Sequence, residues 1–127
     1  MKRSTFSPTR FYHSLRHALR GVGRLFASEP NARIHLLFAV AVPLLAWWLE
    51  VNPCEWLILL VCIGLVLAGE ALNTALEHLC DQVCPEYSEH IRDAKDLAAA
   101  AVLLLATLSV IIGLIIFLPK LLSLLLS

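Results

Sequence analysis

A stripe of polar side chains within one predicted helix is the part of this sequence best suited to chemistry. Its members recur at intervals of three or four residues, as Glu70, Asn73, Glu77 and Asp81. At about 100° per residue, this spacing places all four within about 80° of one another on one helix face. Carboxylates gathered in this way suit the binding of a divalent cation or the removal of a proton from a substrate.

Three further charged residues stand at the predicted starts of other helices. Glu29 precedes the first apolar run, and Lys95 and Asp96 precede the last. Phosphoryl transfer needs carboxylates for Mg²⁺, a cation on the phosphate groups and a base near the attacking hydroxyl. The sequence contains neither a GxxxxGK[ST] loop nor the Gly-rich loop of protein kinases, which excludes the soluble kinase architectures.

The composition places these residues in a membrane protein. Hydrophobic residues make up 59% of the 127 residues and charged residues 16%, and the formal net charge at pH 7 is zero. A soluble domain of this size cannot bury so much apolar side chain. The same numbers exclude a disordered chain and a strongly basic nucleic-acid binder. We therefore expect an all-α membrane protein of one domain, 1–127, without a nucleic-acid partner.

Periodicity predicts a helix on the membrane surface followed by three transmembrane helices. The predicted segments are a surface helix at 10–27 and spans at 29–50, 53–83 and 94–118. The surface helix has an apolar face opposite a face of arginine and histidine, which is typical of an interfacial helix. A soluble amphipathic helix packed on a partner is the alternative.

Local signals set the predicted ends and the orientation of the spans. Asn52, Pro53 and Glu55 form a helix start signal, and Pro119 with Lys120 predicts the end of the third span. Seven Lys and Arg lie in residues 1–33, two in the polar loop expected at 84–96, and none at 50–55. This distribution predicts that the N-terminus and the second loop face the cytoplasm.

Acids within spans are open to other interpretations. A charge near the hydrocarbon core costs at least about 2.5 to 3.5 kcal/mol on insertion scales, so the stripe needs a compensating partner. It would otherwise belong to a proton or cation pathway, or to helix contacts in a non-catalytic assembly subunit. The run 56–69 has no charged side chain to continue an ion path, which weighs against the pathway. A zinc set of His78, Cys80, Cys84 and His90 is disfavoured because the usual CxxC pairs are absent.

The run Glu70–Glu77, with Asp81 and the later Ala94-Lys95-Asp96, resembles the signature E-x-x-N-[ST]-A-[IL]-E…D…A-K-D of the small prokaryotic diacylglycerol kinases. That family includes undecaprenol kinases, and the resemblance extends from about Arg10 to Leu118. It implies a trimeric helical bundle of identical subunits in the bacterial inner membrane, each with three spans and a surface helix. It also implies transfer of the γ-phosphoryl group of Mg-ATP to a lipid hydroxyl at the cytoplasmic interface.

The resemblance further implies roles for individual residues. By position, Glu29 and Glu77 bind Mg²⁺, and Glu70 is the general base. Lys95 contacts phosphate with Asp96 beside it, and Asn73 holds the site together. Further positions near the lipid or nucleotide are Arg10, Glu86 and Glu89. Asp81 is either a supporting member of the site or an acid that anchors a loop. The composite site draws its residues from adjacent subunits.

Position 35 departs from the pattern of the diacylglycerol kinases. That position is acidic in them, whereas this chain has His35, and its Arg33-Ile34-His35 run looks more like the undecaprenol kinase branch. A lone histidine at a helix start is more often structural than catalytic, so we assign His35 no chemistry at this stage. The departure favours undecaprenol as the substrate, with diacylglycerol as the alternative.

Overall fold

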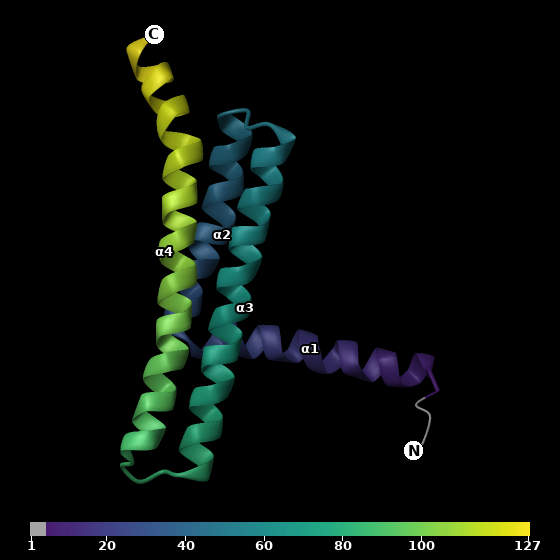
Figure 1. The fold of residues 1–127 in the computed structure, drawn as a ribbon. Coiled ribbons are helices and arrows are strands. Elements are labelled where there is room, and N and C mark those ends of the chain that lie inside the picture. Colours follow the sequence, from purple (N-terminus) through teal and green to yellow (C-terminus); the bar gives the residue numbers. More distant parts are fainter. Residues whose placement is uncertain (1–4) are drawn as a thin grey trace.

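The computed structural model describes residues 5–127, and these residues form four helices and no strand. The helices are α1 (Pro8–Ser28), α2 (Pro30–Trp48), α3 (Pro53–Val83) and α4 (Glu89–Leu126). Figure 1 shows α2, α3 and α4 running side by side, while α1 lies across them and extends away from the bundle. Each of the three bundle helices is long and apolar enough to cross a membrane. The expected all-α membrane protein is therefore confirmed.

The start of α3 follows from its capping residues. The Glu55 backbone N–H donates to Asn52 Oδ1 at 2.9 Å, and the Asn52 N–H donates to Glu55 Oε1 at 3.1 Å. This reciprocal pair satisfies two N–H groups that have no partner within the helix. The helix then continues for 31 residues to Val83. At 1.5 Å per residue it is about 46 Å long, which exceeds the ~30 Å hydrocarbon core, so one end must project from the membrane.

The predicted limits of the last helix are wrong at both ends. The loop expected at 84–96 is much shorter, because α4 begins at Glu89, directly after Ser88 at its N-cap. Lys95 and Asp96 therefore lie inside a helix. At the other end Pro119 is an interior residue, and α4 continues to Leu126.

A tertiary contact holds the continuing helix in place beyond Pro119. A proline removes one backbone hydrogen bond but is tolerated in membrane helices when neighbouring groups compensate. Lys120 Nζ lies 3.1 Å from Glu55 Oε1, and this ion pair fixes the last turns of α4 against the start of α3.

The bundle has little buried core within one chain. A cluster of buried apolar side chains lies at the end of the bundle remote from α1, formed by Ala46, Val51, Leu59, Ile116 and Phe117. Most large apolar side chains of α2, α3 and α4 are exposed. Such surfaces suit contact with lipid or with other membrane helices.

A contact between α3 and α4 lies beside the polar stripe, at Gly69. A Cβ added at Gly69 would lie 2.8 Å from Leu105 Cδ1 of α4. The absent side chain lets the two helices meet next to Glu70. This contact fixes the position of the stripe relative to α4.

Candidate active site

The polar stripe of α3 lies near the level at which α1 crosses the bundle. Residues of α1 and of the middle of α3, including Ser28 and Thr74, line a common pocket, and beyond that level α3 and α4 extend as a pair (Figure 1). Glu70 is only 5% exposed and Thr74 only 8%, and they are the buried polar residues within the described chain. A buried carboxylate needs a partner, because desolvation of its charge is costly.

Glu70 has its partner on a different helix. His35 Nε2 of α2 lies 3.1 Å from Glu70 Oε1, and the two groups form an ion pair when the imidazole is protonated. The side chain of His35 is 22% exposed, against 6% for Glu70. The sequence did not predict this contact, because nothing in it indicates which residues of the first two spans face one another.

Asn73 and Glu77 form a second polar unit one turn further along α3. Asn73 Nδ2 donates to Glu77 Oε1 at 3.3 Å. Asn73 Oδ1 is buried and has no hydrogen-bond partner among residues 5–127. Unpartnered buried acceptors are rare in folded proteins. An amide oxygen and a carboxylate oxygen in one place are the type of ligand that Mg²⁺ prefers.

Lys95 joins the two parts of the signature across the helix pair. Its ammonium group donates to the carboxylate of Asp81, so that the start of α4 is tied to the last turns of α3. Asp96 instead faces Arg92 of its own helix, with 4.0 Å between Asp96 Oδ2 and Arg92 Nε, and both side chains are largely exposed. Asp81, and not the neighbouring Asp96, is therefore the acid that orients Lys95.

Other predicted site residues are not brought together within one chain. Glu29 lies at the junction of α1 and α2, and no ion pair or hydrogen bond of the described residues joins its side chain to Glu77. Glu86 is in the exposed connection before α4, and Glu89 is exposed in its first turn. Arg10 is exposed in the first turn of α1, and α1 extends away from the bundle in Figure 1. No three His, Cys, Asp or Glu side chains of residues 5–127 converge on a possible metal position.

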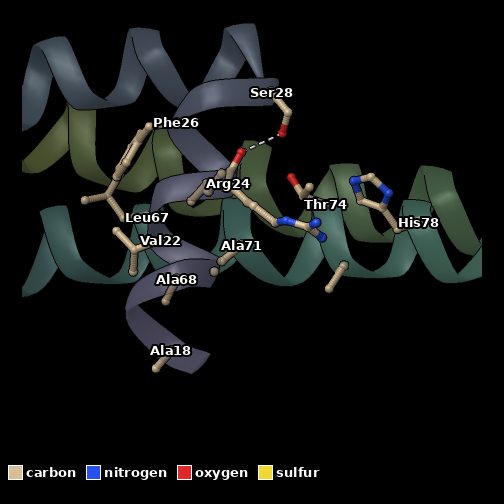
Figure 2. Close-up of a pocket in the computed structure, with 13 residues that line it drawn as sticks. Ala18, Val22, Arg24, Phe26, Ser28, Leu67, Ala68, Ala71, Thr74 and His78 are labelled. Carbon is tan, nitrogen blue, oxygen red and sulfur yellow. Dashed lines mark hydrogen bonds between the residues drawn. The ribbon is translucent and has the colours of Figure 1, made fainter. Parts of the chain in front are cut away.

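A pocket of about 780 Å³ opens between α1 and α3, and residues of α3 other than those of the stripe line it. Its polar lining comes from Arg24 and Ser28 of α1 and from Thr74 and His78 of α3. In Figure 2 the Arg24 side chain extends along α3 toward Thr74 and His78, while the Ser28 hydroxyl donates to the Arg24 carbonyl oxygen at 2.6 Å. A guanidinium group in a pocket of this kind supplies a cation for phosphate.

Sequence reasoning missed these pocket residues. Arg24 continues the i, i+4 series of Arg16 and Arg20. By sequence alone, these arginines indicate only the polar face of a surface helix. Arg24 is the member of the series that lines the pocket against α3. Thr74 occupies the [ST] position of the signature, and its burial is the observation that draws attention to it.

The fold and the site together define a class of protein. It is an integral membrane protein of helices in which a buried carboxylate and an amide–carboxylate pair lie on α3 near the level of a lateral helix, and a lysine of α4 pairs with Asp81 further along α3. These groups match the requirements of phosphoryl transfer, which depends on positioning and on neutralising charge.

Comparison with known proteins identifies the family. The family described as Prokaryotic diacylglycerol kinase matches residues 16–117 of the chain. Undecaprenol kinase of Bacillus subtilis is 41% identical over 112 residues, which are 88% of this chain and 91% of that protein. Diacylglycerol kinase of Synechocystis is 44% identical, over 87% of this chain and 64% of its own length. Diacylglycerol kinase of Escherichia coli K12 is 29% identical, over 87% of this chain and 91% of its own length.

This chain belongs to the prokaryotic diacylglycerol kinase family. It is a membrane lipid kinase, and its two substrates are ATP and a lipid. The expectations of the resemblance for the helices of one chain and for enzyme class are thereby confirmed. The matched region ends before Pro119 and begins after Arg10, so neither residue is covered by the family match.

Proposed function

We propose that this protein phosphorylates undecaprenol with Mg-ATP, on the cytoplasmic side of the bacterial inner membrane. The observation that carries the proposal is the buried Glu70 in line with Asn73 and Glu77, near the level where α1 crosses the bundle. The preference for undecaprenol is supported by His35 and by the similarity to the Bacillus subtilis undecaprenol kinase. Diacylglycerol is the alternative substrate, supported by the similarity to the Synechocystis protein.

In the proposed reaction Glu70 accepts the proton of the lipid hydroxyl. The hydroxyl oxygen forms a bond to the γ-phosphorus of ATP, and the bond from that phosphorus to the β,γ-bridging oxygen breaks. ADP leaves with the bridging oxygen, and the product is a lipid monophosphate. Lys95, held by Asp81, and Arg24 in the pocket would neutralise phosphate charge during the transfer.

Glu77 and Asn73 are the proposed magnesium ligands, with Glu29 as a further carboxylate. The unpartnered Asn73 oxygen beside the Glu77 carboxylate fits an ion that takes oxygen ligands. Mg²⁺ usually keeps several waters and uses only one or two carboxylates with substrate phosphates, so a small donor set is sufficient. Bound with ATP, the ion would neutralise charge on the phosphate groups.

We further propose that three chains assemble and that each site is shared between neighbours. Glu29 and Glu77 do not meet within one chain, and large apolar side chains of the bundle are exposed. A neighbouring subunit would supply the missing carboxylate and cover part of that surface. Mixing subunits tests this arrangement, because trimers of Glu29→Gln and Glu77→Gln chains would regain activity only if the two carboxylates of one site come from different subunits.

The proposed function is tested by transfer of labelled γ-phosphate from ATP in mixed micelles. Undecaprenol and diacylglycerol are offered separately and in competition, with and without Mg²⁺. We expect Mg²⁺-dependent labelling of both lipids, with undecaprenol preferred. Preference for diacylglycerol would overturn the substrate assignment. Absence of labelled lipid, from a protein shown to be folded and assembled, would overturn the whole proposal.

A further inference from the structure

The contact between His35 and Glu70 gives the histidine a function in the proposed reaction. We infer that His35, which lines an apolar groove, is a positioning residue that fixes the Glu70 carboxylate directly behind it for a lipid hydroxyl that arrives through the groove. The inference rests on the proposed function, in which Glu70 takes the proton. It is carried by the ion pair of 3.1 Å and by the place of His35 in the groove.

The burial of the two side chains indicates which of them is the more accessible. Glu70 is almost enclosed, at 6% side-chain exposure, whereas His35 is more open at 22%. The imidazole therefore lies on the accessible side of the pair and the carboxylate behind it. Within the described residues only Glu70 Oε1 has a charged partner, which leaves Oε2 without one. A carboxylate with one oxygen held and the other unoccupied is oriented toward a single incoming proton donor.

The groove leads to His35 from the apolar part of the bundle. It has a volume of about 480 Å³ and lies among α2, α3 and α4. Apolar residues of α2 at helical spacing follow His35 along it, namely Phe38, Val42 and Leu45. The residues of α4 that line the groove extend from Ala106 to Leu121, a length of about 22 Å at 1.5 Å per residue. That is most of the ~30 Å hydrocarbon core.

The polarity of the groove identifies its occupant. His35 is the one basic residue among the described lining, and it stands in the second turn of α2. Ser109, the other side chain with a hydroxyl or ring nitrogen, already donates to the Leu105 carbonyl oxygen at 2.8 Å. A long apolar wall with a single polar end suits a linear lipid with one terminal hydroxyl. The hydroxyl of such a chain would arrive at His35, next to the Glu70 carboxylate that His35 contacts.

Two substitutions separate positioning from packing. His35→Leu fills the space but cannot bind the carboxylate, whereas the amide nitrogen of His35→Gln can reach the position of Nε2. We expect His35→Leu to lower kcat about tenfold, at the low end of the range typical of general-base interactions, with KM for ATP changed less than twofold. We expect His35→Gln to recover most of that loss. Equal loss in both variants, or parental kcat in His35→Leu, would overturn the inference.

A double-mutant cycle tests whether His35 acts through Glu70. Residues that act as a unit have non-additive effects. In a Glu70→Gln background, His35→Leu should therefore lower kcat by less than twofold. A further tenfold loss would show that His35 acts independently, which contradicts positioning. His17→Leu on α1 is the matched control for loss of a histidine, and we expect its kcat to stay within twofold of the parent.

Thermal unfolding of the same variants distinguishes this inference from the proposed function. Coupling of His35 and Glu70 in unfolding midpoints but not in kcat would show a purely structural pair, and the inference would fail while the kinase assignment stands. A parent protein without activity on either lipid would remove the proposed function, and the positioning role with it. Coupling in kcat together with rescue by glutamine would support both.

Discussion

Replacement of Asn73 by leucine separates a functional role for this residue from a structural one. The variant loses the bond from Asn73 Nδ2 to Glu77 Oε1, of length 3.3 Å. A hydrogen bond to a charged group contributes about 1.5 to 3 kcal/mol. The variant also removes the buried Oδ1 that has no partner, which relieves a cost of about 1 to 3 kcal/mol. The two terms nearly cancel, so we expect the free energy of unfolding to change little.

Activity should respond much more strongly than stability. Without Asn73, the Glu77 carboxylate loses the group that orients it, and loss of such supporting contacts typically costs about 10- to 100-fold in metal affinity or activity. We expect Asn73→Leu to raise the Mg²⁺ concentration needed for half-maximal phosphorylation by at least about tenfold. The assay is lipid phosphorylation in mixed micelles at varied Mg²⁺, with the unfolding midpoint measured in the same detergent.

Asn52→Ala is a control that should lose stability and keep activity, the reverse of the result expected for Asn73→Leu. It removes the capping box of α3 at the end of the bundle remote from α1, which should cost about 1 kcal/mol of stability. We expect its activity per folded protein to equal that of the parent. If Asn73→Leu instead loses stability and keeps its Mg²⁺ dependence, Asn73 is a structural residue and the reasoning about its oxygen is refuted.

Five other outcomes are expected. Lys95→Met should abolish detectable phosphorylation, whereas Asp81→Asn, which only loosens the lysine, should lower kcat less than about tenfold, the size typical of a supporting contact. Gly69→Leu should lower the unfolding midpoint, because even a Cβ there meets Leu105 of α4. Lys120→Met breaks the ion pair with Glu55 at the remote end, so the unfolding midpoint should fall only slightly, with unchanged kcat. EDTA should stop transfer of labelled phosphate, and added Mg²⁺ should restore it.

The sequence predicts the class of fold because the membrane imposes simple requirements. Apolar runs of sufficient length give the three spans, and Asn52 with Glu55 gives the start of α3 by local hydrogen bonds alone. The end of α4 was predicted wrongly because Pro119 acts as a helix stop only where tertiary contacts do not compensate. The pairing of Lys120 with α3 is such a contact, and it joins residues that are far apart in the sequence.

The candidate site was predictable only along single helices. Spacing places Glu70, Asn73 and Glu77 on one face of α3, and the bond between Asn73 and Glu77 agrees with that prediction. Contacts between helices depend on rotation and register, which the sequence does not specify. The pairing of His35 with Glu70 belongs to this second kind and was missed.

The most direct test of the central claim is single-turnover transfer of γ-labelled phosphate to undecaprenol by the parent and by Glu70→Gln, with ATP binding measured on the same samples. We expect the variant to bind ATP like the parent and to transfer phosphate at least about 100-fold more slowly, since a general base contributes that much or more. Transfer at the parental rate by Glu70→Gln would contradict the assignment of this polar stripe as the active site.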